Sequence, residues 1–119
     1  MITLFRVPEV WANSLTIPKN DMKHCHVIIT GSVQGVGFRQ FVCTKARTHH
    51  VTGRIWNNSD GSVEAILEGN SEHIQSLLNC CKQGPSLSSV EKVHVCTEHL
   101  IEKSCFDSFE IESSKKNLK

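Results

Sequence analysis

The sequence has almost no net charge and no long apolar run. Its 13 Lys and Arg residues nearly balance 12 Asp and Glu residues, which leaves a formal charge of +1. No overall field therefore draws the protein toward nucleic acid or an anionic membrane, and any anion site must be local. No stretch approaches the roughly 18 apolar residues of a spanning helix. We expect a soluble, cytoplasmic protein with no nucleic-acid or membrane partner.

Several signatures of metal and phosphate chemistry are also missing. No cysteine pair has the spacing of zinc ligands. No glycine is followed by Lys and then Ser or Thr, so there is no Walker loop. Neither the cysteine-to-arginine spacing of the cysteine phosphatases nor an Asp-x-Asp sequence occurs. A phosphate site in this chain would lack a covalent nucleophile and an evident metal, so it must act on a bond that is already weak.

The cysteines are expected to be reduced and mostly buried, because they fall where a strand or helix accommodates a small apolar side chain. His24 and His26 share one face of a predicted strand, but no obvious third ligand accompanies them. We therefore expect neither a disulfide framework nor a metal site. The cysteines are Cys25, Cys43, Cys80, Cys81, Cys96 and Cys105.

A length of 119 residues suits one globular domain. Residues 1–22 show no sustained hydrophobic period, so we interpret them as an extension that is either disordered or not native, since Met22 reads as a natural start. A segment that docks its apolar side chains is the open alternative. The domain is expected at residues 23–112, with a charged tail at 113–119. We expect the extension to be dispensable for fold and activity.

Hydrophobic periodicity predicts the order βαββαβ plus a short terminal strand. Alternating apolar residues mark a strand over 24–31, and a helix of about twelve residues begins near Phe38. Two runs on either side of a Ser-Asp-Gly turn form a hairpin. The remaining elements are a helix between the caps Asn70 and Ser71 and the stop at Gly84 and Pro85, a strand with Val90, Val93 and Val95, and a last strand with Phe109 and Ile111.

This order is that of an α+β ferredoxin-like sandwich, a split βαβ fold in which two helices cover one face of an antiparallel sheet. A right-handed crossover makes the first two strands parallel, with the third between them. The turn after Gly31 and the end of the second strand at Asn57 should therefore be neighbours. Arg54 and Trp56 have the opposite parity to Asn57 and are expected on the open face, with a structural or surface role for Trp56.

A glycine-rich passage links the first strand to the first helix. Gly31, Gly35 and Gly37 permit positive φ and let backbone N–H groups converge. The amides from about Gly35 to Arg39 would face one concavity, supported by the positive end of the helix. Arg39 lies in the first helical turn, where its planar fork suits two phosphoryl oxygens. The pattern alone leaves an anion site and a plain structural turn both open.

Three segments together resemble the acylphosphatase family: GSVQGVGFRQF at 31–41, GRIWNNSDGSVEAILEG at 53–69 and GPSLSSVEKV at 84–93. The resemblance extends over residues 24–111. It implies a monomeric hydrolase that acts on a small acyl phosphate without metal or cofactor. It also implies that Asn57 positions the attacking water and that a phosphate-binding set holds the substrate. That set is Gly35, Val36, Gly37, Phe38 and Arg39.

The implied reaction agrees with what these residues can do. The leaving carboxylate has a conjugate acid with a pKa of about 4 to 5, so it departs without a general acid. Asn57 also has a plain interpretation as a turn former, but Asn58 is available for that task. The chain departs from the family at the end of the first helix, where His50 is expected in a left-handed conformation.

Two other functions remain open at this point. A ferredoxin-like fold also serves in phosphate-binding or RNA-binding modules, although the aromatic strings of RNA recognition are missing. The family also occurs as the N-terminal domain of carbamoyl-phosphate-handling hydrogenase maturation proteins, of which this chain would be a stand-alone relative. Hydrolysis of an aryl acyl phosphate by the purified chain would distinguish these functions. The sequence does not indicate the physiological acyl group.

Overall fold

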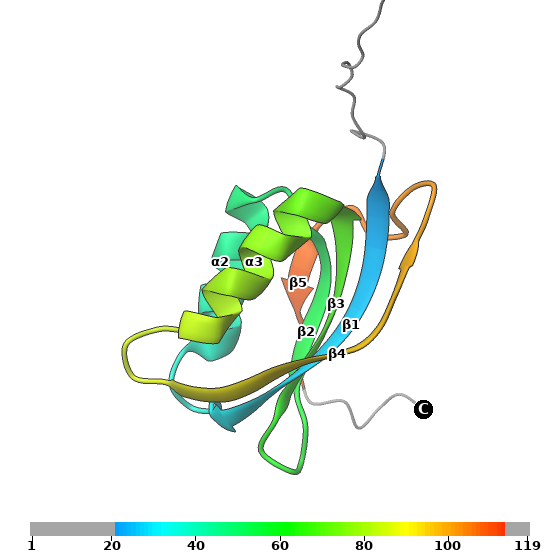
Figure 1. Cartoon of the computed structure of the whole chain (residues 1–119). Helices are drawn as coiled ribbons and strands as arrows, with labels where there is room; N and C mark the ends of the chain where they lie inside the picture. Colours follow the sequence, from blue (N-terminus) through cyan, green and yellow to red (C-terminus); the bar gives the residue numbers. More distant parts are fainter. Residues whose placement is uncertain (1–20, 114–119) are drawn as a thin grey trace, which may run out of the picture.

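The computed structural model describes residues 21–113, which form two helices against one five-stranded sheet (Figure 1). The expected extension and charged tail lie almost entirely outside the described residues. The element order matches the expected βαββαβ plus a short strand. The elements are β1 (Met22–Ser32), α2 (Phe38–Thr48), β2 (Thr52–Asn57), β3 (Val63–Asn70), α3 (Ser71–Gln83), β4 (Ser89–Leu100) and β5 (Phe109–Ile111).

The strand order β4-β1-β3-β2-β5 confirms the ferredoxin-like arrangement, with β3 between β1 and β2. Three of the pairings are antiparallel, as expected. The expectation of a fully antiparallel sheet is wrong at one edge, where β5 pairs parallel with β2. The reason is the path of the chain. Residues 101–108 leave β4 at the end of the sheet where β2 begins, so β5 enters beside β2 and runs in the same direction (Figure 1).

The core lies between the helices and one face of the sheet, as the period-two pattern predicts. The α3 helix is capped at its start by Asn70, one of the two expected caps, whose Oδ1 accepts a hydrogen bond from the Glu72 amide, and at its end by Gly84. Its buried side chains recur at helical spacing and meet alternate residues of β1 and β3. The buried set includes Cys25, Val27, Ile29, Val42, Ala46, Ile55, Val63, Ala65, Leu67, Ile74, Leu77 and Cys81.

The cysteines are free thiols with unequal burial. Burial raises the pKa of Cys25 to about 11 and that of Cys81 to about 12. Cys43 is also buried, but Cys105 is exposed. The expectation of buried thiols is therefore wrong for Cys105, because this residue lies in the segment between β4 and β5 rather than in a strand or helix.

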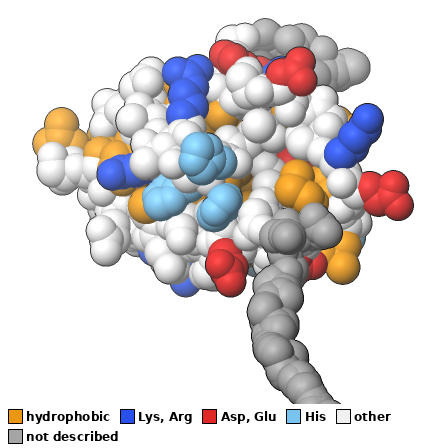
Figure 2. Space-filling model, turned by 90° about the horizontal axis from the view of Figure 1, so that it is seen from above, with side chains coloured by type: hydrophobic (Ala, Val, Ile, Leu, Met, Phe, Trp, Pro, Cys, Tyr) orange, Lys and Arg blue, Asp and Glu red, His pale blue; other side chains and the backbone are white. Residues whose placement is uncertain are grey.

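The end of α2 adopts the expected left-handed turn, with His50 at φ 59°. The Val51 amide donates to the Ala46 carbonyl at 2.8 Å, which closes the helix and leads the chain into β2. The His50 ring lies 5.8 Å from the His73 ring at the start of α3. Figure 2 looks onto this end of the molecule and shows histidine side chains gathered there.

The open face carries two histidine–carboxylate pairs that the sequence did not indicate. His26 pairs with Glu64 and His24 pairs with Glu68, across the β1–β3 ladder. Trp56 is only 8% exposed, so of its two expected roles the structural one is correct. Glu64 and Glu68 are both buried, and burying a carboxylate without a hydrogen-bonding partner such as these histidines would be costly.

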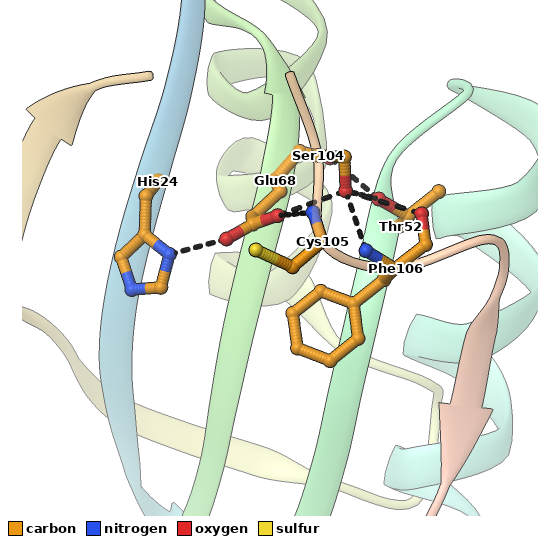
Figure 3. Close-up of polar contacts among 6 residues, drawn as sticks. All are labelled: His24, Thr52, Glu68, Ser104, Cys105 and Phe106. Carbon is orange, nitrogen blue, oxygen red and sulfur yellow. Dashed lines mark hydrogen bonds and ion pairs between the residues drawn. The ribbon is translucent and has the colours of Figure 1, made fainter. Parts of the chain in front are cut away.

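Glu68 fastens the segment between β4 and β5 to the sheet (Figure 3). Its side chain is 4% exposed. Oε2 accepts from His24 Nδ1 at 2.6 Å, and Oε1 accepts from the Ser104 hydroxyl and the Cys105 amide, both at 2.8 Å. Burial acts to raise the pKa of Glu68, but these hydrogen bonds outweigh it and hold the pKa below its ordinary value. The ionised carboxylate is therefore the form that stabilises the fold.

We predict that Glu68→Gln lowers the free energy of unfolding at pH 7 by about 1 to 3 kcal/mol, because a buried charge-assisted network loses its charge. The depressed pKa means that the stabilisation is fully present above the ordinary value of 4.5 and is lost as the pH falls through the lower folded value. Denaturant unfolding from pH 7 to pH 3 should show the gap between parent and variant shrinking in acid.

The matched control is Glu98→Gln, which alters a more exposed carboxylate paired with Lys23. It should change the unfolding free energy by less than about 0.5 kcal/mol. An equal loss of unfolding free energy in both variants, or a difference between parent and Glu68→Gln that stays constant into acid, would show that the charge on Glu68 does not stabilise the segment between β4 and β5.

Candidate active site

The passage between β1 and α2 is shaped by glycines in the left-handed region. Gly35 has φ 74° and Gly37 has φ 79°. A non-glycine residue there would be strained by about 1 to 2 kcal/mol. Gly37 is also the N-cap of α2, and no side chain caps this helix. The helix start is therefore open to an external anion.

The backbone amides of residues 34–39 have no acceptor within the described chain. The first helical bond runs from the Phe41 amide to the Gly37 carbonyl at 3.0 Å. A helix start normally satisfies its first four N–H groups with caps or water. Here these donors and the positive end of the helix dipole are left for a ligand. A phosphoryl group, with several acceptor oxygens, matches such a cradle.

Arg39 extends from the first turn of α2 and is oriented by the end of the domain. Its Nη1 donates to the Glu112 carbonyl at 3.0 Å. That carbonyl is itself held in place, because the Glu112 amide donates to the Ile55 carbonyl at 2.8 Å. No ion pair to Arg39 occurs among residues 21–113. The remaining guanidinium donors are therefore available to an anion.

Asn57, the last residue of β2, has a buried side-chain oxygen without a partner. Oδ1 is one of two buried side-chain polar atoms of the described residues that make no hydrogen bond. An unpaired buried acceptor is costly unless a ligand or water serves it. The turn-forming task falls to Asn58, whose amide donates to the Ser62 carbonyl at 2.9 Å and whose Nδ2 donates to Ser62 Oγ at 3.0 Å. The structure thus separates the two asparagines as the sequence suggested.

One cavity of about 230 Å³ brings most of the expected residues together. It is lined by Val33, Gly35, Gly37, Phe38, Arg39, Gln40, Asn57 and Ile111. Val36 is the exception among the expected phosphate-binding residues: it does not line the cavity, and its side chain packs against the core. Only its backbone amide could contact a ligand. The cavity contains one cationic side chain and no carboxylate, which suits a dianionic group.

Sequence reasoning missed five contributors to the site, two of which, Val33 and Gln40, lie in the recognised segment and line the cavity. Ile111 lines the cavity because β5 lies parallel beside β2, a pairing that the sequence did not predict. Glu112 contributes a backbone carbonyl, which carries no side-chain signal. Gln34 lies within the segment 31–41, but the family resemblance implies no role for it. Its Nε2 donates to two carbonyls of the β2–β3 turn.

A larger hollow of about 460 Å³ lies at the same end of the sheet but suits an anion poorly. It is lined by Thr30, Gly31, Ser32, Asp60, Gly61, Ser62, Ser89 and Glu91. Two carboxylates and no cation face it, so a phosphate would be repelled. Size therefore does not decide between the two cavities, and charge favours the smaller one.

Metal and membrane features are limited in the described part of the chain. Residues 21–113 contain no group of three or more His, Cys, Asp or Glu side chains arranged to hold a metal ion. His24 and His26 instead contact the buried carboxylates Glu68 and Glu64. No helix among these residues is long and apolar enough to cross a membrane.

Comparisons with known proteins identify relatives of this chain in sequence and in fold. The acylphosphatase family model matches residues 25–111. An acylphosphatase of Syntrophus aciditrophicus is 42% identical over 90 residues, which cover 76% of this chain and 92% of that relative. The crystal structure of acylphosphatase from Bacillus subtilis superimposes with a TM-score of 0.70 at 34% identity, covering 76% of this chain and 98% of that one.

The fold also matches part of a much larger protein. The crystal structure of full-length HypF, in its phosphate- and nucleotide-bound form, gives a TM-score of 0.66 at 30% identity. The match covers 78% of this chain but only 12% of that one. The stand-alone relatives, in contrast, are covered over most of their length. The chain therefore belongs to the acylphosphatase family and is an enzyme of that family.

Proposed function

We propose that this enzyme hydrolyses the carboxyl–phosphate anhydride bond of acyl phosphates, by direct attack of a water molecule on phosphorus. The products are a carboxylate and inorganic phosphate. The single observation that carries the proposal is that Asn57, whose buried side-chain Oδ1 has no hydrogen-bond partner, lines the same cavity as Arg39 and the open start of α2. One cavity thus offers donors for a phosphate and an acceptor for a water.

The phosphoryl group is held by backbone donors and one side chain. The amides of Gly35, Val36, Gly37 and Phe38 make no backbone hydrogen bond within the described residues and bind the phosphoryl oxygens, together with the Arg39 guanidinium. These donors are fixed before the substrate arrives, so little reorganisation is needed as negative charge shifts during the reaction. Arg39 is held by the Glu112 carbonyl, which reduces its freedom further. Binding and charge stabilisation thus come from the same groups.

Asn57 positions the nucleophile. Its Oδ1 accepts a hydrogen bond from one O–H of the water, which directs an oxygen lone pair toward phosphorus. An amide is a weak base and takes no proton. The proton of the attacking water passes to a phosphate oxygen of the substrate, while the P–O bond to the acyl group breaks with its electron pair on the carboxylate. The departing carboxylate needs no proton, since the pKa of its acid is about 4 to 5.

The remaining features of the proposal concern the cellular setting. The partner is a small acyl phosphate, not a nucleic acid or a membrane, and the enzyme works as a cytoplasmic monomer. The net charge of +1 supports the absence of a nucleic-acid or membrane partner, because it supplies no general attraction to polyanions. A purely phosphate-binding module would use the loop and Arg39 equally well, but it would leave the buried Asn57 oxygen without a purpose.

We predict that turnover of an aryl acyl phosphate survives extensive treatment with EDTA and is inhibited competitively by inorganic phosphate. The reason is that the proposed cradle consists of amides and Arg39, with no metal as Lewis acid. Initial rates before and after chelation, and with added phosphate, test this. Loss of turnover on chelation with recovery on adding zinc or magnesium would overturn the proposed mechanism.

We predict that substitutions of Arg39 and Asn57 change kcat and phosphate affinity in different ways. Arg39→Gln removes the guanidinium from ground state and transition state, so phosphate affinity and kcat should fall together. Asn57→Ala leaves the cradle intact, so the inhibition constant of phosphate should change less than about threefold while kcat falls by about 100-fold or more. Steady-state kinetics with phosphate as inhibitor measure both quantities.

The matched control for Asn57→Ala is Asn79→Ala, which removes an exposed asparagine amide from α3 that does not line the cavity. It should leave both constants unchanged. Each variant is first shown to be folded by circular dichroism. Near-normal turnover in Asn57→Ala would mean that Asn57 only ends the strand and that another group orients the water.

A further inference from the structure

We propose that Gln34 is a positioning residue, which sets the distance between the bound phosphate and the water held by Asn57. This inference rests on the proposed function. Gln34 does not line the cavity, and its side chain would not touch the substrate. Its effect would pass through the β2–β3 turn. The role therefore differs from that of Arg39 and Asn57.

The geometry of the Gln34 side chain is specific. Its Nε2 donates to the Asn58 carbonyl at 2.7 Å and to the Ser62 carbonyl at 2.9 Å. Both partners are acceptors only, so the amide nitrogen, not the oxygen, must face them. Asn58 and Ser62 are the two ends of the turn, joined by their own backbone hydrogen bond at 2.9 Å. One amide group thus grips both ends of the turn.

This contact joins two halves of the site that no strand ladder connects. Gln34 directly precedes Gly35, where the phosphate cradle begins, and Asn58 directly follows Asn57. The strands that lead to them, β1 and β2, are separated by β3. Within residues 21–113 no backbone hydrogen bond runs from the loop at 33–37 to Asn57 or Asn58. The Gln34 side chain is the direct polar link between loop and turn.

The reaction is sensitive to this link because attack on phosphorus requires close alignment of the two groups. A shift of about 1 Å between reacting groups can cost about 100-fold in rate. Without the Gln34 amide, the loop and the turn are free to separate, and the Asn58 and Ser62 carbonyls each lose one part-buried donor. The cradle itself would be unaffected, since its amides belong to the loop backbone. Phosphate binding should therefore persist while alignment suffers.

The test is a double-mutant cycle between Gln34→Met and Asn57→Ala, with an aryl acyl phosphate as substrate and inorganic phosphate as inhibitor. Methionine preserves length and removes both hydrogen bonds. In the parent, Gln34→Met should lower kcat about 10-fold, as expected for the loss of about 1.4 kcal/mol of transition-state stabilisation. The inhibition constant of phosphate should stay within about twofold. In the Asn57→Ala background the same change should alter kcat by less than about twofold, because no aimed water remains to misalign.

The matched control is Gln75→Met on α3, whose amide bonds only to the exposed Asn79, and it should leave kcat unchanged. If Gln34→Met does not fold, Gln34→Asn keeps an amide on a shorter side chain. It should likewise lower kcat while leaving the inhibition constant of phosphate nearly unchanged. An equal fall in kcat in both backgrounds, or a parallel rise in the phosphate inhibition constant, would overturn the positioning role. Absence of turnover in the parent would instead refute the proposed function.

Discussion

The open start of α2 is the feature on which the rest of the site depends. Gly37 occupies the cap position without a side chain to offer, so the amides of residues 34–39 have no acceptor in the described chain. Such donors need an external partner, and an anion is the partner that the helix dipole favours. The other residues that line this cavity include the cation Arg39, the hydrogen-bond acceptor Asn57 and the apolar side chain of Ile111.

The sheet places these groups with few residues. Because β1 and β2 are both antiparallel to β3, which lies between them, they finish at the same end of the sheet. The loop after β1 and Asn57 at the end of β2 therefore line the same cavity. The last strand then completes the wall. Its parallel pairing with β2 brings Ile111 to the cavity and the Glu112 carbonyl to Arg39. At the opposite end of the sheet, Glu68 fastens the segment that delivers this strand (Figure 3).

Features that depend on near neighbours in the sequence were predictable, whereas features that depend on contacts between distant residues were not. Glycine spacing, the helix period and the caps at Asn70 and Gly84 depend on near neighbours, so these elements were predictable, as was the neighbourhood of the loop and Asn57. The parallel position of β5 and the pairing of His24 with Glu68 depend on residues far apart in the chain. No single-sequence period encodes them. Gln34 was inside the recognised string, but only coordinates reveal which carbonyls its side chain reaches.

The most direct test of water attack on phosphorus is to follow the oxygen atom. Hydrolysis of an acyl phosphate by the enzyme in water enriched in heavy oxygen would be analysed by mass spectrometry of both products. Attack on phosphorus, as the cradle and the Asn57 acceptor imply, breaks the P–O bond and places the heavy oxygen in inorganic phosphate, with none in the carboxylate. Heavy oxygen in the carboxylate would mean attack at the carbonyl carbon and would contradict the role assigned to this site.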